Sequence, residues 1–201
     1  MASSRVALLL SIVATLGLLC SAMVPMPQQL TYGSQTLSVS ANMAFFSSSS
    51  SAILQGALHR VKQQIFMFQS NGQPTNYHLN VTVQSNDENL QFGVDESYTL
   101  EVLADRVSIH APTIWGAMHA LQTFSQLVVW DGSNYSIPSV PINIKDAPRF
   151  PWRGLLVDTA RHFMDVPTLK RQIVAMEASK MNVFHWHAVD AESFPMESTS
   201  E

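Results

Sequence analysis

Four polar side chains that could bind a ligand follow two apolar segments near the C-terminal end of the chain. Asp158 and Arg161 come at the end of the first segment, and His187 and Asp190 come at the end of the second. A guanidinium offers several fixed N–H donors, which suits hydroxyl or carboxylate acceptors. The residues alone leave other roles open, because Arg161 could form a surface or interdomain salt bridge and Asp190 could cap a helix.

A pair of histidines allows a second kind of chemistry. His185 and His187 are two residues apart on a predicted strand, so their side chains point to the same face. Such a pair can bind a metal ion in barrel hydrolases when a distant His or Asp completes the site. No third or fourth ligand is identifiable here, and we therefore expect no metal and no other cofactor.

The segments that carry these residues form a strand–helix–strand pattern. Residues 154–158 are a short continuous apolar strand that ends in a carboxylate, and residues 183–190 are a second predicted strand. Asp165 and Pro167 start a helix between them, because a proline in the first turn costs no helix hydrogen bond. Its inward positions are Leu169, Ile173 and Met176. Short connections between these elements predict a parallel βαβ unit, and in a (β/α)₈ barrel the strand ends on this side carry the chemistry.

The preceding part of the chain predicts a small α+β domain of about 120 residues, with two helices against a mainly antiparallel sheet. Apolar spacing of three and four predicts the helices, and alternation predicts the strands. A serine run, 47–51, is expected to cap the first helix. In chain order the elements are a strand over 37–46, a helix over 53–68, a strand over 79–83, a hairpin over 98–103 and 106–110, a helix over 113–128, and a strand over 136–144, whose two prolines predict a sheet edge.

The first 22 residues are typical of a secretory signal peptide. Arg5 precedes a short apolar run, 6–19, and small residues end with Ala22. The run is shorter than the roughly 20 apolar residues of a membrane span, although a membrane anchor is the alternative. We expect domains at 1–22 (signal peptide), 23–145 (α+β) and 146–201, and no stable membrane span after cleavage.

Composition and short motifs fit a secreted globular protein. The chain has 201 residues, and 46% of them are hydrophobic, which argues against disorder. A net charge of −4 argues against nucleic-acid binding, and a single cysteine excludes a disulfide scaffold. Two sequons, at Asn80 and Asn134, predict N-glycosylation in the secretory pathway. The destination would be the lysosome or vacuole, or the extracellular space.

Three segments resemble the β-N-acetylhexosaminidases of glycoside hydrolase family 20. They are APRFPWRGLLVDTARHF (147–163), KMNVFHWHAVDAESFP (180–195) and WGAMHALQTFSQL (115–127). The resemblance implies an accessory α+β domain followed by a (β/α)₈ barrel. It also implies hydrolysis of terminal β-linked GlcNAc or GalNAc, in which the substrate's own acetamido oxygen attacks the anomeric carbon. A Glu would act as general acid/base beside an orienting Asp, and the partners would be N-acetylhexosamine-containing glycans and, in a homo- or heterodimer, a second subunit.

The resemblance assigns roles to residues that match family positions. Arg161 matches the arginine that hydrogen-bonds hydroxyls of the terminal sugar, and Asp190 matches an aspartate of the active-site network. Asp158 and His187 match motif positions with a packing and hydrogen-bonding role. The family often has a second Asp at position 191, where this chain has Ala191.

Most of the expected barrel lies outside the sequence. Only 146–201 belongs to a barrel that takes about 250 residues, and no match to the family's catalytic Asp-Glu pair occurs. We therefore expect no catalytic residue in this chain and no activity from it alone. Two interpretations stay open: an N-terminal fragment of an active hexosaminidase, or a truncated isoform or accessory module that binds glycan or a partner subunit. A metal-dependent barrel hydrolase is a third, less favoured class.

Overall fold

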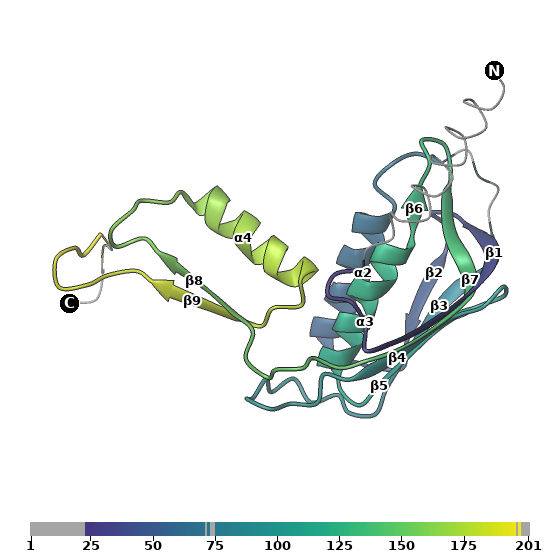
Figure 1. Cartoon of the computed structure of the whole chain (residues 1–201), viewed down its shortest axis with the longest axis horizontal. Helices are drawn as coiled ribbons and strands as arrows, with labels where there is room; N and C mark the ends of the chain where they lie inside the picture. Colours follow the sequence, from purple (N-terminus) through teal and green to yellow (C-terminus); the bar gives the residue numbers. More distant parts are fainter. Residues whose placement is uncertain (1–22, 71, 73–74, 196, 198–201) are drawn as a thin grey trace, which may run out of the picture.

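The computed structural model describes residues 23–70, 72, 75–195 and 197. The predicted signal peptide lies outside these residues. The described chain has two parts that lie side by side (Figure 1). We call the part from β1 to β7 the mixed-sheet unit, and the part that contains β8, α4 and β9 the βαβ unit.

Seven strands form the sheet of the mixed-sheet unit. Its order is β1-β7-β4-β5-β3-β2, with β6 paired to β7. The β2–β3 and β3–β5 pairs are parallel, and the other four pairs are antiparallel. The strands are β1 (Gln29–Val39), β2 (Ala44–Ser47), β3 (His78–Val83), β4 (Tyr98–Val102), β5 (Val107–Ala111), β6 (Val129–Trp130) and β7 (Tyr135–Asp146). The predicted strand over 37–46 is therefore two strands, separated by a turn in which Met43 N–H donates to the Ser40 carbonyl.

Two helices cover one face of this sheet, α2 (Ala52–Ile65) and α3 (Ile114–Leu127). The Ser51 hydroxyl accepts from Leu54 N–H, which confirms the predicted cap of α2. The Thr113 hydroxyl accepts from Gly116 N–H and caps α3, whose first residue is therefore Ile114. Their apolar stripes pack on alternate residues of the strands, and the largest fully buried side chains include Leu54, Leu79, Leu100, Ile109, Ile114, Leu121 and Phe124. The opposite sheet face is polar, with Thr82, Thr99, His110 and Lys145 exposed.

Strand β7 corrects one prediction. Its two prolines predicted an edge strand, yet β7 lies inside the sheet, between β1 and β4. The reason is that β4 pairs only with residues 142–146 of β7. Pro138 and Pro141 precede that stretch, so their missing N–H groups fall outside the β4 ladder. Strands β1 and β2 lie at the two ends of the sheet order, and the two-residue β6 pairs only with β7.

The βαβ unit has the predicted topology. Strands β8 (Gly154–Asp158) and β9 (Val183–His187) are parallel, and α4 (Val166–Ala178) connects them. Asp165 caps α4 by accepting from Thr168 N–H, and Pro167 lies in its first turn. Leu169 and Met176 are buried as predicted, whereas Ile173 is half exposed, at 50%.

The βαβ unit leaves apolar side chains exposed. Leu156 and Trp186, in the middle of β8 and β9, are 56% and 50% exposed. A two-stranded sheet is marginally stable by itself and needs further strands or a helix on its faces. Nowhere in the described residues is there a helix long and apolar enough to cross a membrane.

Candidate functional site

The four predicted polar residues meet at one end of the βαβ unit. Asp158 and His187 are the last residues of β8 and β9, and they face each other in the parallel register. Arg161 lies three residues beyond β8, and Asp190 lies three residues beyond β9. Because parallel strands end at the same edge of a sheet, the sequence placed these residues together correctly.

Asp158 holds Arg161 through both of its oxygens. Asp158 Oδ2 accepts from Arg161 Nε at 2.6 Å and lies 2.5 Å from Nη2. Asp158 Oδ1 accepts from the backbone N–H groups of Ala160 and Arg161, which fixes the turn itself. Partial burial opposes ionisation of Asp158, but these hydrogen bonds and the Arg161 charge outweigh it and lower the pKa of the carboxyl.

Asp190 lies on the other side of the same arginine. Its Oδ1 accepts from the backbone N–H groups of Glu192 and Ser193, and its Oδ2 lies 3.8 Å from Arg161 Nε. The N–H of Glu192, then that of Ser193 and the Arg161 charge, lower the pKa of Asp190. His187 Nε2 is 3.6 Å from Asp190 Oδ2, and it is buried without a hydrogen-bond partner among the described residues.

This arrangement suits binding of a polar ligand better than proton donation. The Arg161 side chain is 62% exposed, while Asp158 restrains its Nε edge. Its remaining N–H groups can donate to hydroxyls. Asp158, Asp165 and Asp190 all have lowered pKa values, whereas a general acid needs a pKa near the working pH.

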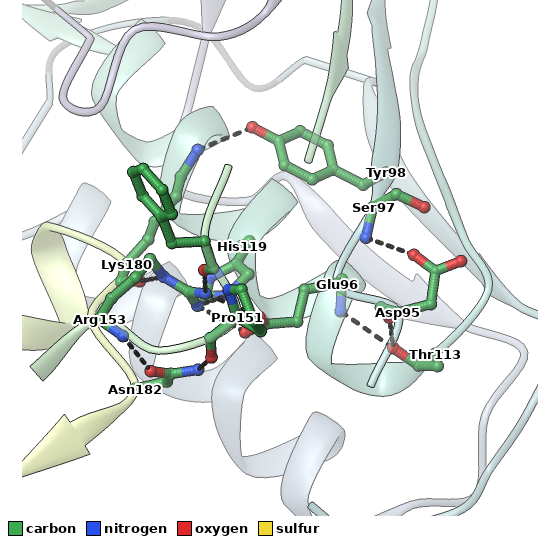
Figure 2. Close-up of polar contacts among 12 residues, drawn as sticks. Asp95, Glu96, Ser97, Tyr98, Thr113, His119, Pro151, Arg153, Lys180 and Asn182 are labelled. Carbon is green, nitrogen blue, oxygen red and sulfur yellow. Dashed lines mark hydrogen bonds and ion pairs between the residues drawn. The ribbon is translucent and has the colours of Figure 1, made fainter. Parts of the chain in front are cut away.

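The residues that link the two units were not predicted from the sequence. Figure 2 shows Arg153 beside Glu96 and His119, and Lys180 beside Tyr98. Glu96 and Lys180 are buried, at 7% and 5% exposure. Arg153, His119 and Lys180 lie within the segments that carry the resemblance, and Tyr98 begins the predicted hairpin, but nothing in these patterns pairs them with Glu96 or Asp146. Of the alternatives for Arg161, the surface salt bridge is observed, with Asp158 and Asp190, and neither ion pair bridges the two units.

The structure also places the residues considered for a metal ion and those predicted for N-glycosylation. Across the described residues, no group of three or more His, Cys, Asp or Glu lies close enough to hold a metal ion. Asn80 lies inside the sheet on β3, paired with Phe46 and Ser108. Asn134 lies in the turn between β6 and β7, where its backbone N–H donates to Asp131 Oδ1.

Two family models match the chain. Residues 23–127 match the model described as beta-acetyl hexosaminidase like, and residues 150–201 match the catalytic domain of glycosyl hydrolase family 20. The chain belongs to glycoside hydrolase family 20. Within this family it matches the N-terminal part of the β-N-acetylhexosaminidases.

Individual family-20 relatives agree. Beta-hexosaminidase subunit A1 of Dictyostelium discoideum is 38% identical over 181 residues, which cover 88% of this chain and 34% of the relative. Beta-hexosaminidase 1 of Arabidopsis thaliana is 36% identical over 199 residues, covering 87% of this chain and 37% of the relative. The chain therefore spans about a third of these family members.

Solved family-20 structures share the fold. The chitobiase of Flavobacterium johnsoniae superimposes with a TM-score of 0.70 at 31% identity, covering 88% of this chain and 28% of that one. An exo-β-N-acetylglucosaminidase of Vibrio harveyi superimposes with a TM-score of 0.68 at 26% identity, covering 86% of this chain and 26% of that one. These likenesses support an accessory domain followed by the start of a catalytic barrel.

Proposed function

We propose that the chain supplies the accessory domain and first barrel strands of a hydrolase that removes terminal, non-reducing β-linked N-acetylhexosamine. The observation that carries this proposal is Arg161, held by Asp158 and exposed at the shared end of β8 and β9. A (β/α)₈ barrel binds its substrate at this end of its strands. The family relatives that are named β-hexosaminidases or N-acetylglucosaminidases favour GlcNAc or GalNAc as the sugar.

In this proposal the described residues bind the sugar, and later residues catalyse the reaction. Arg161 donates hydrogen bonds to hydroxyls of the terminal ring. Asp158 restrains the Nε edge of the guanidinium, so less side-chain freedom is lost on binding. Asp190 lies beside Arg161 and stays ionised, which adds a second acceptor near the ring. His187 Nε2, buried and unpaired among the described residues, is available to the same hydrogen-bond network.

The bond-breaking step needs groups that this sequence does not supply. Attack by the acetamido oxygen requires a general acid at the leaving oxygen, and retention follows when water later opens the cyclic intermediate. Asp158 and Asp190 are poor proton donors because their pKa values are lowered. We therefore propose that the 201-residue chain alone is inactive, and that activity belongs to a longer product that carries this sequence.

The test is kinetic. In such a longer product, Arg161→Lys should lower kcat/KM on 4-nitrophenyl N-acetyl-β-glucosaminide about a hundredfold, because lysine keeps the charge but lacks the planar fork. Arg106→Lys is the matched control, since Arg106 is a half-exposed arginine in the turn after β4. Equal kcat/KM for Arg161→Lys and the parent enzyme would refute the assignment.

A non-catalytic binding role is the second candidate, because the exposed Arg161 beside two carboxylates of lowered pKa suits ligand binding better than proton donation. A truncated isoform or accessory module could bind a glycan or a partner subunit. The transcript beyond the codon for Glu201 distinguishes the two. Further strand–helix repeats with an Asp-Glu pair support the hydrolase, and a stop codon supports the module.

A further inference from the structure

The start of β8 is fixed to the mixed-sheet unit by one arginine. Arg153 precedes β8 by one residue, and its Nη2 and Nη1 donate to Glu96 Oε1 and Oε2 at 2.6 and 2.9 Å. The Arg153 Nε donates to the Lys180 carbonyl at 2.7 Å, and Nη1 also donates to the Phe150 carbonyl. A bidentate pair of this kind fixes orientation as well as distance.

The start of β9 is fixed to the same unit by a buried lysine. Lys180 lies in the turn between α4 and β9, and its Nζ donates to Asp146 Oδ2 at 3.0 Å and to the Tyr98 hydroxyl at 2.8 Å. Its backbone has φ 57°, a left-handed conformation that disfavours a lysine. The hydrogen bonds to Asp146 and Tyr98 hold this turn against β7 and β4.

The two anchored starts are also joined to each other. Asn182 Oδ1 accepts from Arg153 N–H at 3.0 Å, and Asn182 N–H donates to the Arg153 carbonyl at 3.0 Å. From this point both strands run five residues in register, from Gly154 opposite Val183 to Asp158 opposite His187. At about 3.3 Å per residue, the Asp158–His187 end of the two strands lies roughly 16 Å from Arg153 and Asn182.

We propose that Glu96 and Asp146 of the mixed-sheet unit are positioning residues for the Asp158–Arg161 pair. They hold the starts of β8 and β9, and the strand register carries that restraint to the opposite end. The central side chains of this two-stranded sheet are exposed, and such a sheet is marginally stable by itself, so a restraint from the mixed-sheet unit bears on how firmly its strands are held. Use of the positioned arginine for a sugar rests on the proposed function, but the restraint itself does not.

The test uses the full chain, labelled with ¹⁵N, and no sugar. Two N–H groups report on the far end: the Thr159 amide, which donates to the His187 carbonyl at 3.0 Å, and the Arg161 Nε–H, which donates to Asp158. Glu96→Gln should accelerate exchange of both with solvent by about tenfold or more, because it leaves Arg153 buried without its counter-ion. Glu101→Gln is the matched control and should change neither, because Glu101 is a half-exposed carboxylate on β4, 3.9 Å from Arg106.

Amides of α3 around Phe124 report whether the mixed-sheet unit stays folded. Unchanged exchange in α3 together with faster exchange at Thr159 and Arg161 supports the proposal, and Asp158→Ala, which removes the acceptor, should abolish the protected Arg161 Nε–H signal in both backgrounds. The proposal is overturned if Glu96→Gln leaves Thr159 and Arg161 unchanged. It is equally overturned if α3 accelerates by the same factor, because Glu96 would then act only on global stability.

Discussion

Two glycines, one in α2 and one in α3, should respond in opposite ways when each is replaced by alanine. Gly116 lies in the first turn of α3, and a Cβ built there collides with the Ser97 carbonyl oxygen, a backbone atom that cannot move aside. Gly56 lies inside α2, where a Cβ would meet only Arg60 Nη1, at 3.3 Å. That guanidinium is the far end of a flexible, exposed side chain.

The magnitudes follow from two competing effects. Replacing a helical glycine by alanine stabilises a helix by up to about 1 kcal/mol. Overpacking a well-packed contact costs roughly 1–3 kcal/mol. Gly116→Ala should therefore lower the free energy of unfolding by about 1 kcal/mol, and Gly56→Ala should raise it by up to about the same amount, since only helix propensity changes there.

Urea unfolding, followed by far-UV circular dichroism, measures both changes. With an m-value of about 2 kcal/mol/M, the midpoint should fall by about 0.5 M for Gly116→Ala and rise by up to about 0.5 M for Gly56→Ala. A rise for Gly116→Ala as large as that for Gly56→Ala would show that α3 does not approach β4 as closely as described, and would refute the reasoning.

Two further predictions concern acid and glycan. Burial opposes ionisation of Glu96, but hydrogen bonds from His119 and Arg153 and their charges lower its pKa from the ordinary 4.5 to about 2. The stability that Glu96 contributes, on the order of 3 kcal/mol, is therefore present above pH 4.5 and lost as the pH falls toward 2. Urea midpoints measured over this pH range should fall less steeply for Glu96→Gln than for the parent chain. An equal fall in both would contradict the assignment of this acid sensitivity to Glu96. In secreted material, peptide mapping should find glycan more often on Asn134, which lies in a turn, than on Asn80, which lies within the sheet. The same mapping should find that the mature chain begins after Ala22. An intact Met1, or two asparagines without glycan, would contradict the secretory interpretation.

Local patterns were enough to predict most elements. The 4-3-4-3 spacing that begins at Leu54 predicted α2, alternation around Val81 predicted β3, and Asp165 with Pro167 predicted the start of α4. The same patterns predicted that Asp158, Arg161, His187 and Asp190 meet, because parallel strands end together. These features depend on residues that are close in the sequence.

Features that depend on distant residues were not predictable. A proline keeps a strand out of the sheet interior only where a neighbouring strand would need its N–H. Strand β4 pairs with β7 only from Ile142 onward, so it needs no N–H from Pro141. Ile173 has the spacing of an inward residue, yet the described residues do not cover it. The pairing of Glu96 with Arg153 joins positions 57 residues apart, and no local pattern specifies such a pair.

Contact between Arg161 and a terminal sugar is tested most directly by a double-mutant cycle between enzyme and substrate. In a longer product that carries this sequence, kcat/KM is measured for the parent and Arg161→Lys on 4-nitrophenyl N-acetyl-β-glucosaminide and on its 3-deoxy and 4-deoxy analogues. If Arg161 donates to one of these hydroxyls, removing that hydroxyl should cost the parent enzyme about tenfold or more and cost Arg161→Lys much less. Equal losses for both enzymes with both analogues would contradict the sugar-binding assignment of Arg161.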